Sequence, residues 1–381
     1  MHFIGALLFC CGKQQAWLLE LMADKASRLG IAPVVMAGPA GASAARHKVE
    51  RMCVERCRSL SIVVGLLVGL WAGLAQAQCV ALVPASGGAS FWDLVRQGAE
   101  RAGAELGVEV YYRGTPRSED ASAQLKIIEL SLKHGCQAMV IAPVGPAITG
   151  YAAQLREQRG LPSVYIDRNV GGDPDGWLIA TDNRRAGEQA GRWLADYLGG
   201  QGEVLLVRLS PDIASTTARE EGFLSAARAG GLSVDGSQVL GDDAQRIHTY
   251  LLDKPQRFKA LFSVNASTTS ASYAALRHLN AQPPLVHVGF DSSVQLASAL
   301  AAGEIQALLL QQAQTMGYDA VHLVWQLAQG KTPSGPKVRG LDASITTADN
   351  LDNADIRALL SYQPRPAPGN AAATSTAGGT P

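Results

Sequence analysis

Short apolar runs that stop at a polar residue recur along this chain, and they constrain its fold more than any other feature. Four of these runs end at Asp167-Arg168, Asn265, Asp291 and Gln311. Each run is followed by a helical pattern, which is typical of a buried parallel strand and its crossover helix. In open parallel sheets, ligands bind outside the carboxyl ends of the strands. The pattern therefore predicts an α/β protein with a binding cleft for a small polyhydroxylated molecule.

Strand and helix patterns alternate in two successive series of similar size. We expect strands over 79–84, 108–112, 137–142, 163–166 and 177–180, and then over 203–208, 233–240, 260–264, 285–290 and 305–310. Gly135 is predicted to cap the helix before it, and Asp182-Asn183 to start the helix that opens the second series. Two βα series predict two doubly wound parallel-sheet lobes.

Residues 52–77 have the pattern of a secretory signal peptide: two arginines, an apolar stretch from Leu60 to Leu74, and Ala75-Gln-Ala77. The alternative, a membrane anchor, needs about 20 apolar residues. We therefore predict cleavage after Ala77 and export to the periplasm. Residues 1–51 are expected to be an over-extended gene start, and the alternative is an ordinary N-terminal extension. The Pro-, Ala- and Gly-rich residues 363–381 are expected to be a disordered tail.

Cysteine usage agrees with export. Four of the six cysteines precede the predicted cleavage site, which leaves Cys79 and Cys136. In an oxidising compartment such a pair predicts one disulfide, and the alternative is two buried free thiols. Removing residues 1–77, with eight basic and four acidic residues, leaves 25 basic and 29 acidic ones. This balance argues against a nucleic-acid partner.

Six motifs in order carry a family resemblance. They are Phe91-Trp92, Tyr165-Ile-Asp-Arg168, Ala180-Thr-Asp-Asn183, Ala218-Arg-x-x-Gly-Phe223, Val288-Gly-Phe-Asp291 and the Gln311 segment. With them the chain resembles the type I periplasmic binding proteins, close to the ribose- and galactose-binding group. The resemblance implies two lobes that close on one ligand about three hinge segments, near 181, 312 and 340. The N-terminal lobe would hold 78–181 and 312–340, and the C-terminal lobe 182–311 and 341–362.

The resemblance also implies a set of ligand-binding residues. Phe91 and Trp92 would supply aromatic walls for the C–H face of a sugar ring. The polar contacts would come from Asp167, Arg168, Arg219, Asn265, Asp291 and Gln311. For Asp291 a second interpretation stays open, which is a cap for a helix that begins at Ser292.

Three positions depart from the family. Ala89 stands where the family often has Asn, Ala266 follows Asn265 in place of Asp, and no aromatic lies near Ala244. One hydroxyl contact and one wall are therefore missing, so ribose is not predicted as the ligand. Ser86 or Ser90 is a candidate replacement for the lost amide.

Motifs for catalysis are missing from the sequence. It has no G-x-S-x-G elbow, no P-loop and no H-E-x-x-H. A glycosidase pair of Asp167 and Asp291 is disfavoured, because the nearby arginines would keep both carboxylates ionised. We predict a monomeric, cofactor-free solute receptor that delivers a sugar-like ligand to the membrane permease of an ABC transporter. The alternative is a sensory receptor of the same fold that presents its ligand to a histidine kinase or a chemoreceptor.

Overall fold

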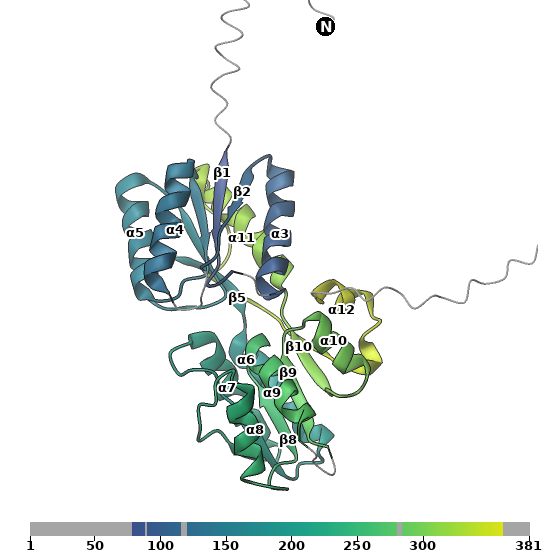
Figure 1. Ribbon diagram of the computed structural model, residues 1–381. Coiled ribbons are helices and arrows are strands. Elements are labelled where there is room, and N and C mark those ends of the chain that lie inside the picture. The colour runs from purple at the N-terminus through teal and green to yellow at the C-terminus, as the bar shows by residue number, and fades with distance from the viewer. Residues whose placement is uncertain (1–77, 88–89, 116–119, 280–283, 361–381) are drawn as a thin grey trace, which may run out of the picture. The chain divides into compact units, whose positions relative to one another are not determined.

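Two six-stranded sheets form the framework of the chain in a computed structural model (Figure 1). The structure describes residues 78–87, 90–115, 120–279 and 284–360. The strands of the first sheet are β1 (Cys79–Val83), β2 (Glu109–Tyr112), β3 (Ala138–Ile141), β4 (Ser163–Ile166), β5 (Trp177–Thr181) and β11 (Val338–Leu341). Those of the second are β6 (Glu203–Val207), β7 (Ser233–Asp235), β8 (Ala260–Ser263), β9 (Val286–Phe290), β10 (Ala307–Leu310) and β12 (Ser344–Thr346). The predicted signal peptide and the predicted tail lie outside the described residues.

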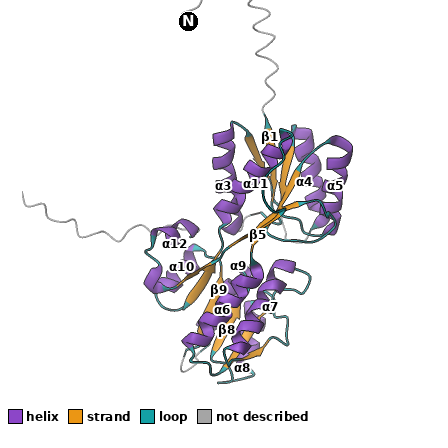
Figure 2. Cartoon of the chain, turned by 180° about the vertical axis from the view of Figure 1, so that it is seen from behind, coloured by secondary structure: helices purple, strands orange, loops and turns teal. Residues whose placement is uncertain are grey.

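Helices connect most successive strands (Figure 2), and the exceptions are β4 with β5 and β11 with β12. Those of the first sheet are α3 (Ser90–Leu106), α4 (Ala121–His134), α5 (Pro146–Arg159) and α11 (Ala313–Ala328). The second series has α6 (Asn183–Tyr197), α7 (Ala214–Ala229), α8 (Ala244–Leu252), α9 (Ala266–Arg277), α10 (Val294–Ala301) and α12 (Ala354–Leu359), with a short 3-10 helix at Ala348–Asn350. The two βα series predicted from the sequence are therefore confirmed.

The central strands of each sheet are buried on both faces, which explains why they are largely apolar. In β1, Val80 and Leu82 belong to a core cluster with α3 and α11, whereas Cys79, Ala81 and Val83 belong to a second cluster with α4 and α5. Alternate side chains of a strand point to opposite faces, so both sets must be apolar.

The two sheets have the same strand order. The first runs β11-β5-β4-β3-β1-β2 and the second runs β12-β10-β9-β8-β6-β7. All pairs are parallel except β10 with β12. The chain passes from one sheet to the other after Thr181, after Leu310 and after Leu341. Because strand order repeats throughout and strand direction repeats in all but the edge strands β11 and β12, each of the other strands has a topological equivalent in the second sheet.

Helix ends follow their predicted signals. Gly135 ends α4 in the left-handed conformation, with φ 97°, and its N–H bonds to carbonyls of the last helical turn. Asp182 is the N-cap of α6, and its side chain accepts a hydrogen bond from the backbone N–H of Arg185. Both residues act as the sequence predicts.

The structure corrects one strand and adds two. The strand predicted over 233–240 ends at Asp235, because the Asp235 side chain accepts a hydrogen bond from the Ser237 N–H and turns the chain. Strands β11 and β12 were not predicted as strands. They are only four and three residues long, and most of β11 is exposed, so no buried apolar run marks it.

Close backbone packing joins α6 to α7 in the second series. A Cβ atom at Gly187 would lie 2.1 Å from the Arg219 carbonyl oxygen, and one at Gly222 would lie 2.0 Å from the Arg184 carbonyl oxygen. Only glycine permits this approach. The contact fixes the backbone of α7 at Arg219, which is one of the predicted site residues.

Cys79 and Cys136 lie side by side at the start of neighbouring strands. Their Cα atoms are 4.3 Å apart and their sulfurs are at bonding distance. The Gln137 N–H donates to the Cys79 carbonyl, which continues the pairing of β1 with β3. The pairing of β1 with β3 thus places the two cysteines where a disulfide requires them.

We expect mature protein, denatured without reductant, to contain no titratable thiol. The loop between the cysteines spans 57 residues, for which the chain-entropy model gives on the order of 4 kcal/mol. Reduction, or the double change Cys79→Ser and Cys136→Ser, should lower the free energy of unfolding by an amount of that order. Two titratable thiols per chain in the unreduced protein would contradict the disulfide.

His287 is a fully buried titratable group in the second sheet. Its Nε2 lies 3.0 Å from Ser263 Oγ, and its Nδ1 has no hydrogen-bond partner within the described residues. Burial lowers the pKa of His287 to about 4 from its usual 6.5. The folded protein therefore holds this imidazole neutral, while the unfolded chain takes up a proton below about pH 6.5.

Stability should consequently fall as the pH drops from about 6.5 through 4, because protons bind the unfolded state first. The loss attributable to His287 is about 2–3 kcal/mol by pH 4.5. Urea denaturation at pH 7.5 and 4.5 measures it. His287→Gln should reduce the difference, whereas His278→Gln, a change at an exposed histidine of the same lobe, should not. Equal pH dependence in wild type and His287→Gln would refute this.

Candidate functional site

Five of the predicted ligand-binding residues stand at or just beyond the carboxyl ends of strands. Asp167 and Arg168 follow β4, and Asn265, Asp291 and Gln311 follow β8, β9 and β10. Arg219 comes from α7, and Phe91 and Trp92 from the first turn of α3. The candidate site is therefore built mainly from the edge at which parallel α/β sheets bind ligands.

The two carboxylates occupy equivalent positions in the two lobes. Asp167 follows the fourth strand of the first series and has φ 71°, and Asp291 follows the fourth strand of the second and has φ 62°. The Asp167 N–H donates to the Ile179 carbonyl of β5, and the Asp291 N–H donates to the Leu309 carbonyl of β10. Left-handed backbone is unfavourable for a residue with a Cβ, and such outliers concentrate at functional sites.

Asp291 is held by contacts from both of its oxygens. Gln311 Nε2 donates to Oδ1 at 2.7 Å, and the Ala266 N–H donates to Oδ2 at 3.2 Å. Gln311 Oε1 in turn accepts from the Thr181 hydroxyl at 2.7 Å. Thr181 ends β5 and Gln311 follows β10, so this bond joins two of the segments that pass between the sheets.

Arg219 is 2% exposed, and its guanidinium is surrounded by partners. Nε donates to Asn183 Oδ1 at 2.8 Å, and Nη1 donates to the Val264 carbonyl at 2.9 Å. The guanidinium carbon lies 4.1 Å from the centre of the Phe290 ring, a cation–π contact. The sequence motif Ala180-Thr-Asp-Asn183 contains the residue that orients this arginine.

Buried charges of opposite sign influence one another across the site. Burial lowers the pKa of Arg219, and the charges of Asp291 and Asp167 oppose that shift. Burial likewise raises the pKa of Asp291, opposed by the charge of Arg219 and by the Gln311 hydrogen bond. Arg168 Nε donates to Asp167 Oδ2 at 3.1 Å. Two carboxylates and two guanidinium groups thus share one buried region with a formal charge of zero.

The helix-cap interpretation applies to Asn265 and is wrong for Asp291. Helix α10 begins at Val294, and its N-cap is Ser293, whose side chain accepts from the Leu296 N–H. Asn265 instead caps α9, because its Oδ1 accepts from the Thr268 N–H in a reciprocal capping box. The capping role occupies the carbonyl oxygen of Asn265, so the amide NH₂ is what this residue can offer a ligand.

Phe91 and Trp92 meet edge to face, with ring centres 4.8 Å apart. Both belong to the core cluster of the first lobe. Phe91 also lines a cavity of about 10 Å³, enough for one water molecule, which it shares with Asp291, Gln311 and residues of α3, α11 and α12. The structure therefore brings Phe91 next to the polar groups of the second lobe. The Trp92 ring packs edge to face against the Phe91 ring.

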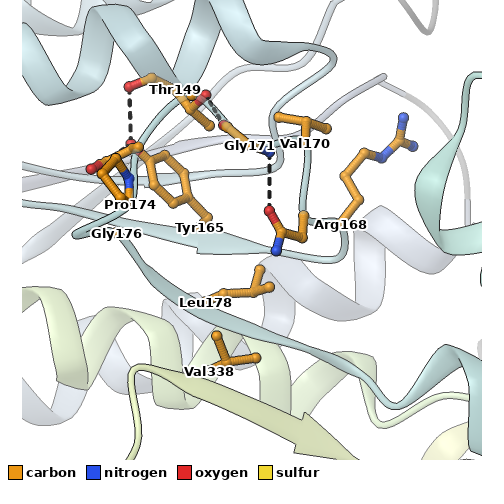
Figure 3. Close-up of a pocket in the computed structure, with 12 residues that line it drawn as sticks. Thr149, Tyr165, Arg168, Val170, Gly171, Pro174, Gly176, Leu178 and Val338 are labelled. Carbon is orange, nitrogen blue, oxygen red and sulfur yellow. Dashed lines mark hydrogen bonds between the residues drawn. The ribbon is translucent and has the colours of Figure 1, made fainter.

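A larger hollow, of about 480 Å³, lies beside Arg168 in the loop between β4 and β5 (Figure 3). Arg156 donates two hydrogen bonds to Asp173, at 2.6 and 2.8 Å, and the Tyr165 hydroxyl donates to the same carboxylate at 2.7 Å. Thr149 ties the loop again through its bond to the Gly171 carbonyl. These bonds brace the loop that carries Arg168, whose side chain extends away from the Tyr165 ring in the figure.

Several supporting residues were not predicted as part of the site. Thr181 and Asn183 were assigned to a family motif, a hinge segment and a helix start, and not to the site, although they hold Gln311 and Arg219. Arg208 follows β6 at the same edge and donates to Glu220 at 2.8 Å. An arginine directly after an apolar run was the available signal for it.

Among the described residues, the potential metal ligands Cys79, Glu109 and His134 offer atoms within 4.8 Å of one another. The Cys79 sulfur is bonded to Cys136 in this arrangement and is not offered to an ion. In the same part of the chain, no helix combines the length and apolarity that crossing a membrane requires.

Residues 80–332 of this chain match the sequence model of a protein family that is described as the periplasmic binding protein domain. This chain belongs to the periplasmic binding protein family. Its place is in the ribose group of type I members, as the relatives indicate. The ribose import binding protein of Bacillus subtilis is 24% identical over 242 residues, which are 63% of this chain and 78% of that protein.

Solved structures of periplasmic sugar-binding proteins share the fold. The periplasmic component of an ABC-type sugar transport system from Hahella chejuensis is 30% identical, with a TM-score of 0.64, covering 71% of this chain and 99% of that one. A solute-binding protein of an Agrobacterium vitis ABC transporter, bound with α-D-tagatopyranose, is 23% identical with a TM-score of 0.67. That comparison covers 74% of this chain and 99% of the other.

In this periplasmic binding protein, Asp291→Asn should raise the dissociation constant of a ligand that the wild type binds by about tenfold to over a hundredfold. The reason is that a charge-assisted hydrogen bond to the ligand is lost. Asparagine tolerates the left-handed backbone, but it keeps one acceptor oxygen for the Gln311 and Ala266 donors, so the melting temperature should fall modestly. Asp291→Ala would add backbone strain and is a less clean test. Calorimetric titration and thermal melts measure the two effects.

The matched control is Asp243→Asn, which neutralises an exposed carboxylate that caps α8 in the same lobe. It should leave affinity unchanged. Normal affinity in Asp291→Asn together with a lower melting temperature would assign Asp291 a structural role and remove it from the site.

Proposed function

We propose that this protein captures a neutral sugar in the periplasm and delivers it to the membrane permease of an ABC transporter. The observation that carries the proposal is the buried, charge-balanced group of Asp167, Arg168, Arg219 and Asp291, to which each lobe contributes one carboxylate. In this proposal the sugar joins the two lobes, and they close on it about the three segments that pass between the sheets.

Charge balance favours a neutral ligand. The two carboxylates and two guanidinium groups already offset one another, so an added ionic group would be buried without a counter-charge. Hydroxyl groups suit the remaining capacity, because a hydroxyl both donates and accepts. Asp291 uses two acceptor positions of the roughly four that a carboxylate offers. Arg219 likewise uses two of its five N–H groups.

The relatives support a role in import. The ribose import binding proteins and the sugar transport component of Hahella chejuensis are named for sugar transport. None of the relatives reported above is named as a sensory receptor, and no contact in the described residues favours that alternative. The proposal includes a monomeric protein that is exported to the periplasm with cleavage after Ala77 and that carries the Cys79–Cys136 disulfide.

A matched panel of sugars tests the proposal. Mass spectrometry of small molecules released from the purified, denatured protein should identify a sugar. After refolding, calorimetry should show binding of a neutral hexose or pentose, and the corresponding uronic acid should bind at least about tenfold more weakly because it buries an unbalanced charge. The radius of gyration from small-angle scattering should decrease with the bound sugar.

The control is Asp291→Asn, which leaves the site with a net positive charge. Its preference for the neutral member over the uronic acid should shrink or reverse. Tighter binding of the uronic acid by the wild type, or binding of no sugar by correctly folded protein, would overturn the proposed function.

A further inference from the structure

The amino-terminal end of the first sheet brings three possible metal ligands together. Cys79 begins β1, Glu109 begins β2, and His134 is the last residue of α4. The ligand atoms of these three side chains all lie within 4.8 Å of one another. Asp167 and Arg168 follow β4 at the opposite, carboxyl end of the same sheet. The cluster is therefore separate from the proposed sugar site.

Strand register and helix packing assemble the cluster. Cys79 and Glu109 are partners in the parallel pairing of β1 with β2, so their side chains point to the same face of the sheet. Cys79 packs in the core cluster that contains Ile127 and Ile128, and α4 therefore covers this face. His134 ends that helix, and its Nε2 lies 3.0 Å from Glu109 Oε1. The fold itself thus brings the three side chains together.

Neighbouring groups orient the His134 ring. It stacks on the ring of Tyr111, with ring centres 4.3 Å apart and an angle of 24° between the planes. Tyr111 lies two residues after Glu109 in β2, so both side chains leave the strand on the same face. His134 also ends a helix of 14 residues, and the C-terminal end of a helix dipole attracts a cation. Both features favour a metal ion at this position.

The donor set suits zinc. Zn²⁺ binds thiolate sulfur at about 2.3 Å and imidazole nitrogen or carboxylate oxygen at about 2.0 Å, in a tetrahedron. These bond lengths place neighbouring donor atoms about 3.3–3.6 Å apart. A group within 4.8 Å therefore needs to contract by little more than about 1 Å to hold the ion. One thiolate and one carboxylate also cancel the double charge of the ion.

Burial of the three side chains leaves a path for the ion. Glu109 and His134 expose 46% and 41% of their side chains to solvent, whereas Cys79 is 1% exposed. An ion can therefore enter between the carboxylate and the imidazole and meet the sulfur at the base of the cluster. The exposed side leaves room for a water molecule as the fourth ligand.

The disulfide determines whether the sulfur is available. While Cys79 is bonded to Cys136, its sulfur is not a thiolate and is no ligand for zinc. A dithiol reductant passes two electrons and two protons to the disulfide, which becomes two thiols, while the reductant itself becomes a disulfide. Zn²⁺ then replaces the proton of the Cys79 thiol, and that proton passes to water.

We propose that Cys79, Glu109 and His134 form a zinc site in the reduced protein, with water as the fourth ligand, and that the Cys79–Cys136 disulfide prevents zinc binding. The site lies at the end of the first lobe remote from the sugar site, so it does not depend on which ligand the protein carries. Oxidation of the zinc-bound protein to the disulfide releases the ion.

Two single variants form a matched pair for the test. Cys136→Ser and Cys79→Ser both abolish the disulfide, but only Cys136→Ser keeps the sulfur of the site. Without reductant, Cys136→Ser should bind Co²⁺ with the near-ultraviolet absorption band of a thiolate–cobalt bond, and Zn²⁺ should displace the Co²⁺. Cys79→Ser should show no such band and should bind Zn²⁺ on the order of a hundredfold more weakly in competition with a chromogenic chelator. Equal binding by the two folded variants would refute the site.

Wild-type protein provides a second measurement that needs no cysteine variant to fold. Protein purified from the periplasm should bind Zn²⁺ after treatment with a phosphine reductant and should not bind it before. Zinc binding that is the same before and after reduction, or no binding after reduction, would overturn the inference.

A histidine variant tests the second ligand. In the reduced protein, His134→Ala should weaken zinc binding at least about tenfold. The matched control is His322→Ala, because His322 lies 3.4 Å from Glu105 in the same lobe and, among the described residues, no third ligand of this kind joins that pair. It should leave the zinc affinity unchanged. Equal affinities of the two histidine variants would remove His134 from the site and contradict the proposal.

Discussion

A buried guanidinium must be surrounded by acceptors and counter-charges, and Arg219 imposes that requirement on the second lobe. Its partners come from three different places: Asn183 at the start of α6, the Val264 carbonyl after β8, and the Phe290 ring in β9. Gly187 brings α6 close enough to α7 for this arrangement. Burying the Arg219 guanidinium removes it from water, and that cost must be compensated within the protein. The helix packing, the strand ends and the Asp291 carboxylate all contribute to this compensation.

Topological equivalence explains why each lobe contributes a carboxylate. Asp167 and Asp291 follow equivalent strands, both have positive φ, and the N–H of each bonds to the next strand of its sheet. That bond keeps the backbone in register while the left-handed residue turns its side chain out of the strand line. The backbone strain, about 1–2 kcal/mol per residue, is offset by the packed sheet on either side.

Sequence periodicity predicted the strands that are buried on both faces, because their apolar runs end sharply at polar residues. It overran at Asp235, where a side-chain hydrogen bond turns the chain, and it missed β11 and β12, which are short. For the site, the pattern identified which residues stand at the edge of each sheet. It could not assign their hydrogen bonds: the cap that was one interpretation of Asp291 is provided by Ser293, and Asn265 caps the neighbouring helix α9.

Gln124 shows most clearly what sequence patterns omit. It is a polar residue of α4, yet it is buried and bonds to the ends of β1 and β3. A buried amide with its main bonds made to backbone is a rigid support, since breaking any one bond would leave a polar group unpaired. The Gln124 amide thereby fixes the backbone at the ends of β1 and β3 relative to each other, and β3 pairs with β4, the strand that leads into Asp167.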